Sequence, residues 1–297
     1  MAPASSARRC RTAAITLLVL LLAGCAGSAA KESEEAPPDA LLAAGEAAER
    51  SGDLNGALID YVKALTADKN NAEGHYRVAR VHAAMGNADT AREAYLHALA
   101  LKPDHVGALE GLGLLLLQQG QHDTASYDAA NGYLHKAVAK DPSRWRSFNG
   151  LGALADIEGK HRLAQAYFNY ALKLGPERPS VLNNLGYSHY LDGDFKGARA
   201  YFERTASIEP ANQHAWSNLG LVLTRLGSYD DAVRAFEHIM EPPAARYSTA
   251  YVCMLDGKLT EAEKLLQAAI QLSPSYYVEA HAALDRVHTE QGKLRPR

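Results

Sequence analysis

The sequence predicts an all-α solenoid, in which helical hairpins stack side by side along the chain. Two observations lead to this fold class. A glycine is followed by an alanine seven times, five residues later in six cases, and most successive pairs are 34 residues apart. The pairs are Gly52/Ala57, Gly86/Ala91, Gly120/Ala130, Gly159/Ala164, Gly193/Ala198, Gly227/Ala232 and Gly257/Ala262. Many units also end on a proline, which cannot continue a helix: Pro103, Pro142, Pro176, Pro210 and Pro274. This period indicates a unit of two helices joined by a turn.

Single units resemble the tetratricopeptide repeat. Repeat five reads Ser180–Tyr187, followed by Gly193, Ala198, Phe202 and Pro210. Repeats four and six share most signature positions: Leu151, Gly152, Gly159, Ala164, Phe168, Ala171 and Pro176, and Trp216, Leu219, Gly220, Gly227, Ala232 and Phe236. Small residues on both helices let the backbones approach closely, and larger apolar side chains fill the remaining space. The resemblance implies a solenoid of about seven repeats with a capping helix over residues 40–291.

Along the chain, three repeats depart from this pattern. Repeat one lacks the closing proline, since Lys69 stands there, and terminal repeats are expected to be atypical. Repeat three carries five extra residues within 121–132, which the sequence leaves open as a bulged loop or a lengthened helix. Repeat six is four residues short and ends at Glu241–Pro243. A helix from about 278 to 291 is expected to cap repeat seven, with 292–297 as a tail.

The N-terminus resembles a bacterial lipoprotein signal. Arg8–Arg11 is a positive segment, and the apolar stretch Thr12–Ala23 is shorter than the about 20 residues that span a bilayer. The stretch runs into Leu22-Ala23-Gly24-Cys25. The resemblance implies that residues 1–24 are a signal peptide and that Cys25 carries a covalent lipid. An ordinary cleaved signal followed by an unrelated cysteine is the alternative.

The segment 25–39 is rich in Ala, Ser, Glu and Pro, and it has too little apolar content to pack. We therefore expect it to be a lipidated flexible tether. Ala26 follows the cysteine at the position where an aspartate would, in many Gram-negative species, retain the protein at the inner membrane. The resemblance thus implies a membrane anchor on the periplasmic face of the outer membrane.

Composition and motifs argue against nucleic-acid binding and catalysis. Three of the 31 basic residues lie in the leader, which leaves 28 against 34 acidic ones, a net charge of about −6. We see no basic face that would bind phosphates. There is no phosphate-binding glycine loop or nucleophile motif, and the repeats leave no room for a catalytic domain. We expect no enzyme, and no cofactor besides the lipid on Cys25.

Histidines and a cysteine are the remaining candidates for chemistry. His75/His82 and His281/His288 are each seven residues apart, which is two turns on one helix face. This spacing is possible for a metal, but packing and surface roles are the favoured interpretation. Cys253 falls on an apolar helix position, which favours a small core residue over a reactive thiol.

Function is therefore expected on a surface, and the family resemblance implies a concave groove lined by the first helices. The predicted groove residues are Tyr76, Arg80, Glu110, Leu114, Asn149, Asn183, Tyr187, Tyr190, Ser217, Leu221, Arg225, Tyr247 and Tyr251. Tyrosine is enriched at binding hot spots, so the four C-terminal tyrosines favour that half as the binding face. The alternative is that these tyrosines pack between repeats. With mainly Arg80 and Arg225 as basic groove residues, a clamp for carboxylates is not expected.

The C-terminal run Tyr251–Gly257, then Ala262-Glu263 and Ser273–Tyr277, is similar to the TadD family of tetratricopeptide lipoproteins of the Tad (Flp) pilus. This resemblance implies a lipid-anchored scaffold whose partner is a secretin or another pilus-assembly component. The alternative function is an adaptor for peptidoglycan hydrolases, envelope proteases or outer-membrane protein assembly.

Overall fold

The chain is described here by a computed structural model that covers residues 36–120, 124–273, 275 and 277–294. Within these ranges all regular structure is helical, which confirms the predicted all-α class. The predicted signal peptide, Cys25 and most of the tether lie outside the described residues. None of the described helices is both long enough and apolar enough to cross a membrane.

Fifteen helices are found in the described residues, and fourteen of them form seven hairpins. They are α1 (Pro38–Arg50), α2 (Leu54–Ala67), α3 (Ala72–Ala84), α4 (Ala88–Leu101), α5 (Val106–Gln119), α6 (Thr124–Lys140), α7 (Trp145–Ile157), α8 (His161–Leu174), α9 (Pro179–Leu191), α10 (Phe195–Ile208), α11 (Gln213–Arg225), α12 (Tyr229–Glu237), α13 (Pro242–Leu255), α14 (Leu259–Leu272) and α15 (Val278–Leu294). The solenoid begins at Pro38, two residues before the expected start, and the final helix runs to Leu294 instead of 291.

The turn glycines set the geometry of most hairpins. Six of the seven have φ between 69° and 84°, a left-handed conformation that costs glycine little because it has no Cβ. Gly120 is the exception, with φ −71° and ψ 11°. Repeat three is also the repeat that carries the five extra residues.

Small residues allow the two helices of a repeat to approach closely. A Cβ added to Gly152, Gly186 or Gly220 would come within 2.5–2.8 Å of the phenylalanine ring that packs against it. The rings are Phe168, Phe202 and Phe236. The seven alanines of the second helices are fully buried, as the repeat pattern predicts. A larger side chain at any of these positions would therefore force the hairpin apart.

The two irregular repeats differ from the others in helix length. Helix α6 has 17 residues, against 14 in most other second helices, and the extra turn precedes Ala130. Three of the five extra residues therefore lengthen the helix. Helix α12 has only nine residues, and α13 begins at Pro242 after a connection of ordinary length. The deletion in repeat six thus shortens the second helix by more than one turn.

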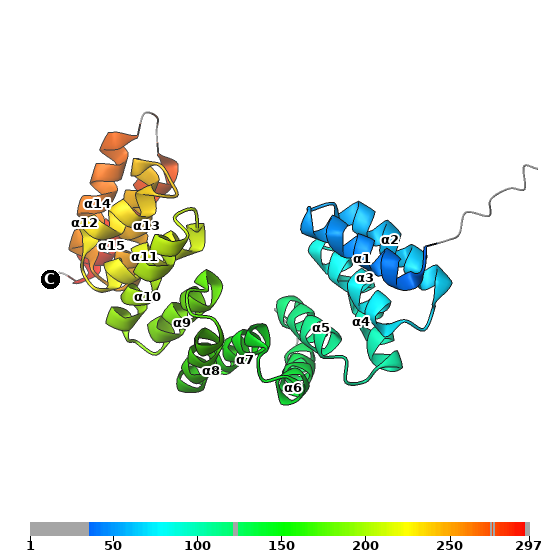
Figure 1. The fold of residues 1–297 in the computed structure, drawn as a ribbon. Helices are drawn as coiled ribbons and strands as arrows, with labels where there is room; N and C mark the ends of the chain where they lie inside the picture. The colour runs from blue at the N-terminus through cyan, green and yellow to red at the C-terminus, as the bar shows by residue number, and fades with distance from the viewer. Residues whose placement is uncertain (1–35, 121–123, 274, 276, 295–297) are drawn as a thin grey trace, which may run out of the picture.

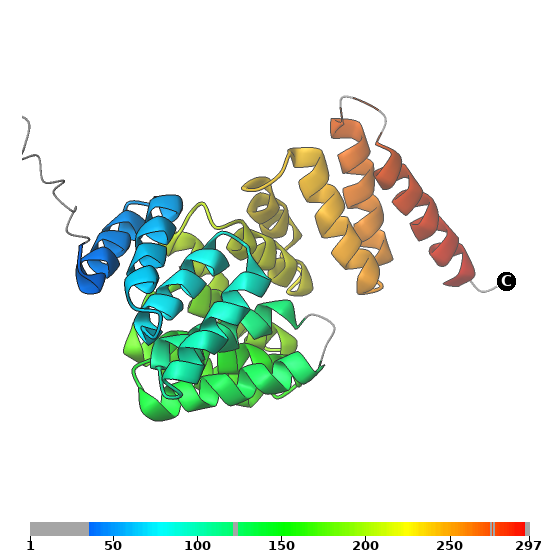
Figure 2. The same ribbon diagram turned by 90° about the vertical axis from the view of Figure 1, so that its right-hand side faces the viewer.

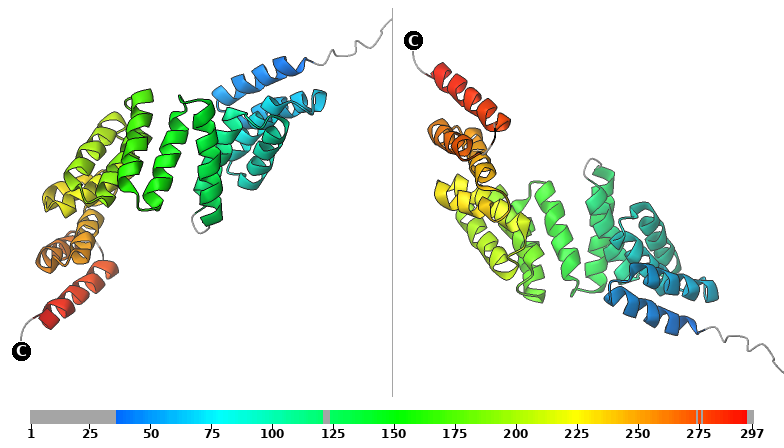
Figure 3. Two further views of the ribbon diagram at one scale, coloured as in Figure 1. Left: turned by 90° about the horizontal axis from the view of Figure 1, so that it is seen from below. Right: turned by 90° about the horizontal axis from the view of Figure 1, so that it is seen from above.

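The array curves so that the first helices lie inside. From α3 to α15, each first helix also contacts the next first helix, whereas the second helices make their main contacts only with first helices. Because the inner helices are closer together than the outer ones, the stack bends into a horseshoe (Figure 1). The two ends are also displaced from the plane of the curve, as the turned views show (Figures 2 and 3).

Candidate binding surface on the concave face

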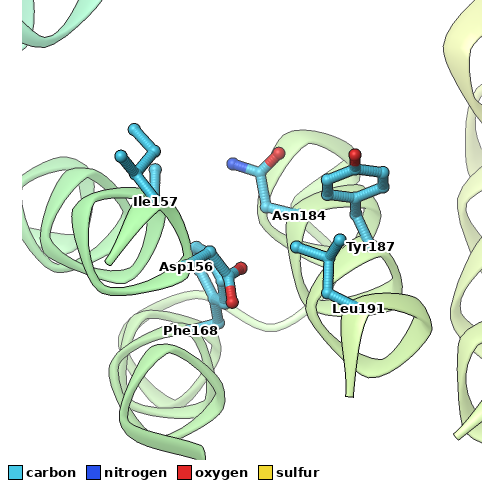
Figure 4. A pocket seen from close by; sticks show the side chains of 7 residues that line it. Asp156, Ile157, Phe168, Asn184, Tyr187 and Leu191 are labelled. Carbon is cyan, nitrogen blue, oxygen red and sulfur yellow. The ribbon is translucent and has the colours of Figure 1, made fainter. Parts of the chain in front are cut away.

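One face of each first helix is directed towards the concave side of the array. Residues ten, six and two before the turn glycine are spaced by four and therefore share a helix face. Figure 4 shows this face in repeats four and five: Ile157 and Tyr187, with Asn184 beside them, point away from α8, which lies on the outer side. The predicted groove residues lie on or beside this face.

In repeats one to three, charged residues of this face are paired with one another. Arg80 Nη2 lies 2.6 Å from Glu49 Oε1, and the hydroxyl of Tyr61 donates to the other oxygen of Glu49 at 3.0 Å. The Tyr76 ring packs beside the His105 ring, with centroids 4.8 Å apart. Tyr76 and Arg80 are therefore engaged within the protein and only partly exposed.

A second chain of ion pairs crosses three helices. Arg77 bridges Glu46 on α1, at 2.6 Å, and Glu73 on α3. Glu73 in turn lies 3.0 Å from His105 Nε2, at the start of α5. The hydrogen bond from His105, aided by Arg77, lowers the pKa of Glu73 to about 2. Burial and the hydrogen bond to Glu49 raise the pKa of Tyr61 to about 12. These charges of the N-terminal inner face are thus paired within the protein.

Glu110 does not point into an open groove as expected. It is only 8% exposed, and it accepts a hydrogen bond of 2.8 Å from the Ser147 hydroxyl on α7. Arg144 Nη1 lies 3.7 Å from its other oxygen. Glu110 therefore joins repeats three and four and is excluded from the candidate surface.

The asparagines of repeats four to six pair between repeats. Asn184 Nδ2 donates to Asn149 Oδ1 at 3.1 Å, and Asn218 Nδ2 donates to Asn183 Oδ1 at the same distance. Asn149 and Asn183 were predicted as groove residues. The structure instead makes each of them one half of an inter-repeat pair.

Three more predicted residues, Tyr190, Arg225 and Tyr247, contact other side chains of the array. Arg225 Nε donates to the Tyr190 hydroxyl at 3.1 Å, and Arg225 Nη1 pairs with Asp256 of the next repeat. Tyr247 packs against Tyr251 and Tyr277, with ring centroids 6.5 and 5.6 Å apart. The contact of Tyr247 with Tyr277 fits the alternative of packing between repeats, whereas Tyr251 contacts Tyr247 on its own helix and is exposed.

What stays open is a set of apolar side chains in the C-terminal half. We call it the apolar stripe: Ile157 (52% exposed), Tyr187 (43%), Leu191 (38%), Tyr251 (46%) and Leu255 (63%). The sequence prediction contained the two tyrosines but missed the three aliphatic residues. Each of these stands two residues before a turn glycine, one helical turn beyond the tyrosine position, so the spacing itself could have found them.

A pocket opens within the apolar stripe, between α7 and α9 (Figure 4). Its volume is about 350 Å³, and its lining is mostly apolar. The lining residues are Ala153, Asp156, Ile157, Phe168, Asn184, Tyr187 and Leu191. The Asp156 side chain is 9% exposed and is the one charged group of the lining. This combination of apolar walls and a few polar groups is typical of binding sites.

The cysteine and histidines that were considered as candidates for chemistry make contacts within the fold. Cys253 is fully buried, and burial raises the pKa of its thiol to about 11, which confirms a core position. His75 Nε2 lies 3.0 Å from the Lys69 carbonyl oxygen, and His82 contacts Asn87. In the described part of the chain, no three His, Cys, Asp or Glu side chains are placed to hold a metal ion.

Family comparisons agree with this geometry. The profile of the middle TPR-like domain of cilia- and flagella-associated protein 70 matches residues 40–174. Two tetratricopeptide repeat profiles match residues 158–212 with 240–277, and 189–250. These matches follow the hairpins seen in the structure. The chain is a tetratricopeptide-repeat protein. None of the matched families is a family of enzymes, and this fold is in general a scaffold for protein interactions.

Solved tetratricopeptide-repeat structures share the fold at low sequence identity. Pseudomonas aeruginosa pilF is 24% identical, with a TM-score of 0.57, covering 78% of this chain and 96% of its own. A tetratricopeptide repeat protein from Parabacteroides merdae is 13% identical, with a TM-score of 0.55 and coverages of 84% and 98%. A chain of the Cut9–Hcn1 complex is 19% identical, with a TM-score of 0.62, and the match covers 82% of this chain and 48% of that one. A search of curated protein sequences gave no match.

Proposed function

We propose that this protein is a lipid-anchored periplasmic scaffold whose apolar stripe binds a partner protein during assembly of a Tad (Flp) pilus. The observation that carries the binding role is the stripe itself, because exposed apolar side chains gathered on one face mark interaction surfaces. The position of the anchor rests on the Cys25 signal. The Tad assignment rests on the resemblance of the segment 251–277 to the TadD family.

The proposal makes the pilus secretin, or another pilus-assembly component, the expected partner. The lipid on Cys25 would hold the protein at the outer membrane, and the concave face would hold the partner there. A concave surface suits this task, because a segment lying along the inner helices contacts several repeats at once.

A complementation experiment tests the proposal. Deletion of the gene is expected to reduce secretin multimers in the outer membrane, and the wild-type gene is expected to restore them. A Y251S/L255S variant removes apolar area from the stripe and is expected not to restore them. The matched control is I59S/V62S, which changes two side chains of similar exposure (56% and 48%) on the outer helix α2.

Three outcomes would overturn parts of the proposal. Normal secretin multimers and normal piliation in the deletion strain would exclude the pilus role. Recovery of peptidoglycan hydrolases by the wild-type protein but not by Y251S/L255S, together with altered cell shape, would support the adaptor function instead. A C25S variant that remained in the membrane fraction would contradict the lipid anchor.

A further inference from the structure

The pocket of the apolar stripe exists because one repeat carries a small residue. Ala153 stands six residues before the turn glycine of repeat four. The corresponding positions of repeats five, six and seven hold Tyr187, Leu221 and Tyr251. Where the other repeats place a large side chain, repeat four leaves the space between Ile157 and α9 open (Figure 4).

The floor of this pocket carries a negative charge. Asp156 Oδ1 accepts two hydrogen bonds, from His161 Nδ1 at 2.9 Å and from the Ser188 hydroxyl at 2.8 Å. Its second oxygen, Oδ2, accepts no hydrogen bond from the residues that the structure describes. It is also not one of the fully buried side-chain atoms of those residues that lack a hydrogen-bond partner. Figure 4 shows the carboxylate directed from α7 towards α9. One acceptor therefore remains available to a molecule in the pocket.

Asp156 differs from four other carboxylates of the first helices and their ends, each of which has an arginine partner. These pairs are Glu46 with Arg77, Glu49 with Arg80, Glu110 with Arg144, and Asp256 with Arg225. Within the described residues, the only ion-pair partner of Asp156 is His161. No lysine or arginine of the described chain neutralises it, although its side chain is nine-tenths buried.

We infer that this pocket receives a lysine or arginine side chain of the partner protein that docks on the apolar stripe. The inference rests on the proposed binding function and adds to it the chemistry of the partner. The methylene groups of such a side chain would lie along Ile157, Tyr187 and Leu191, and its cationic head would meet Asp156 Oδ2.

A purely apolar side chain fits this pocket less well. It would displace water from Oδ2 without supplying a donor, and a buried carboxylate that loses its hydrogen bonds is strongly unfavourable. An acidic side chain would add like-charge repulsion to that loss. Of these three kinds of side chain, only the cationic one contacts the apolar walls with its methylene groups and also donates to Asp156 Oδ2.

Peptides selected from a random 12-residue phage library on the purified protein provide the probe. Each tight binder is synthesised with its lysine or arginine kept, or replaced by norleucine or citrulline, and its dissociation constant is measured by fluorescence anisotropy. Norleucine or citrulline is expected to weaken binding to the wild-type protein at least about tenfold.

Two variants locate the effect. D156N keeps an oxygen that accepts from His161 and Ser188 but places an amide donor where Oδ2 was, so it is expected to bind the lysine and norleucine peptides about equally. A153L fills the pocket with the residue that repeat six carries at the equivalent position, and it is expected to weaken the lysine peptide to the norleucine level. Thermal melting followed by circular dichroism checks that both variants fold.

The outcomes separate the inference from the proposed function. If wild-type protein binds the norleucine and lysine peptides equally, or if D156N keeps the preference for lysine, the inference is wrong while the apolar stripe remains a binding surface. If no selected peptide loses affinity for Y251S/L255S, the proposed surface fails and the inference fails with it.

Discussion

The two halves of the concave face use the same repeat in opposite ways. In repeats one to three the inner positions hold charged side chains that pair across helices, as Arg80 does with Glu49. In repeats four to seven the inner positions leave five apolar side chains open to solvent. The N-terminal half thus pairs its inner charges within the array, whereas the C-terminal half has pairs of its own, such as Arg225 with Asp256, and in addition leaves an apolar surface open. Position in the repeat decides where a side chain points, but not whether a neighbouring repeat supplies its partner.

The largest expected effect on stability comes from removing one partner of a side-chain pair in the N-terminal half. In an E110A variant, the Ser147 hydroxyl loses its acceptor and Arg144 loses a nearby carboxylate. Because Glu110 is nearly fully buried, we expect thermal and urea unfolding to show a loss of about 2 kcal/mol. A double variant E110A/S147A is the control, and it is expected to lose less than the sum of the two single changes. A loss below about 0.5 kcal/mol for E110A would mean that this contact does not join the repeats.

A smaller effect on stability is expected when the pH is lowered. The pKa of Glu73 is lowered to about 2 in the folded protein, mainly by the hydrogen bond from His105, against an ordinary value of 4.5. Since the folded pKa is the lower one, the ionised Glu73 stabilises the protein above pH 4.5, and this contribution is lost as the pH falls towards 2. The side chain is 42% exposed, so solvent screening keeps the contribution below about 1 kcal/mol.

The measurement is the difference in unfolding free energy between wild type and E73Q across pH. We expect wild type to be the more stable protein at pH 6, and we expect the difference to shrink between pH 4.5 and pH 2. A difference that stays constant over this range would show that the ionised Glu73 does not hold α3 to α5 in the way that the distances indicate.

The difference between the two halves also explains which features of the fold and of the concave face could be predicted from the sequence. The hairpins were predictable because each needs only local features: a turn glycine, a small residue opposite an aromatic ring, and a buried alanine. The pairing of Asn149 with Asn184 was not predicted, because it depends on how two repeats pack and not on either repeat alone. The same holds for Glu110, whose burial comes from Ser147 and Arg144 of the next repeat. Gly120 departs from the turn-glycine rule in the repeat that carries the insertion.

The smallest effect on stability is expected in the open half, and there it is the most informative. Tyr187 and Leu191 are exposed, and polar substitutions at exposed positions usually change stability by less than about 0.5 kcal/mol. A Y187S/L191S variant is therefore expected to melt within about 2 °C of wild type, while its affinity for a peptide that binds the stripe falls at least about tenfold. The outer-face variant I59S/V62S is expected to change neither quantity. If Y187S/L191S were destabilised as strongly as E110A, these two side chains would serve the packing of α9, and the distinction between a paired half and an open half would fail. If instead the fold is retained and only binding is lost, the exposure of these residues is maintained for a partner and not for the array.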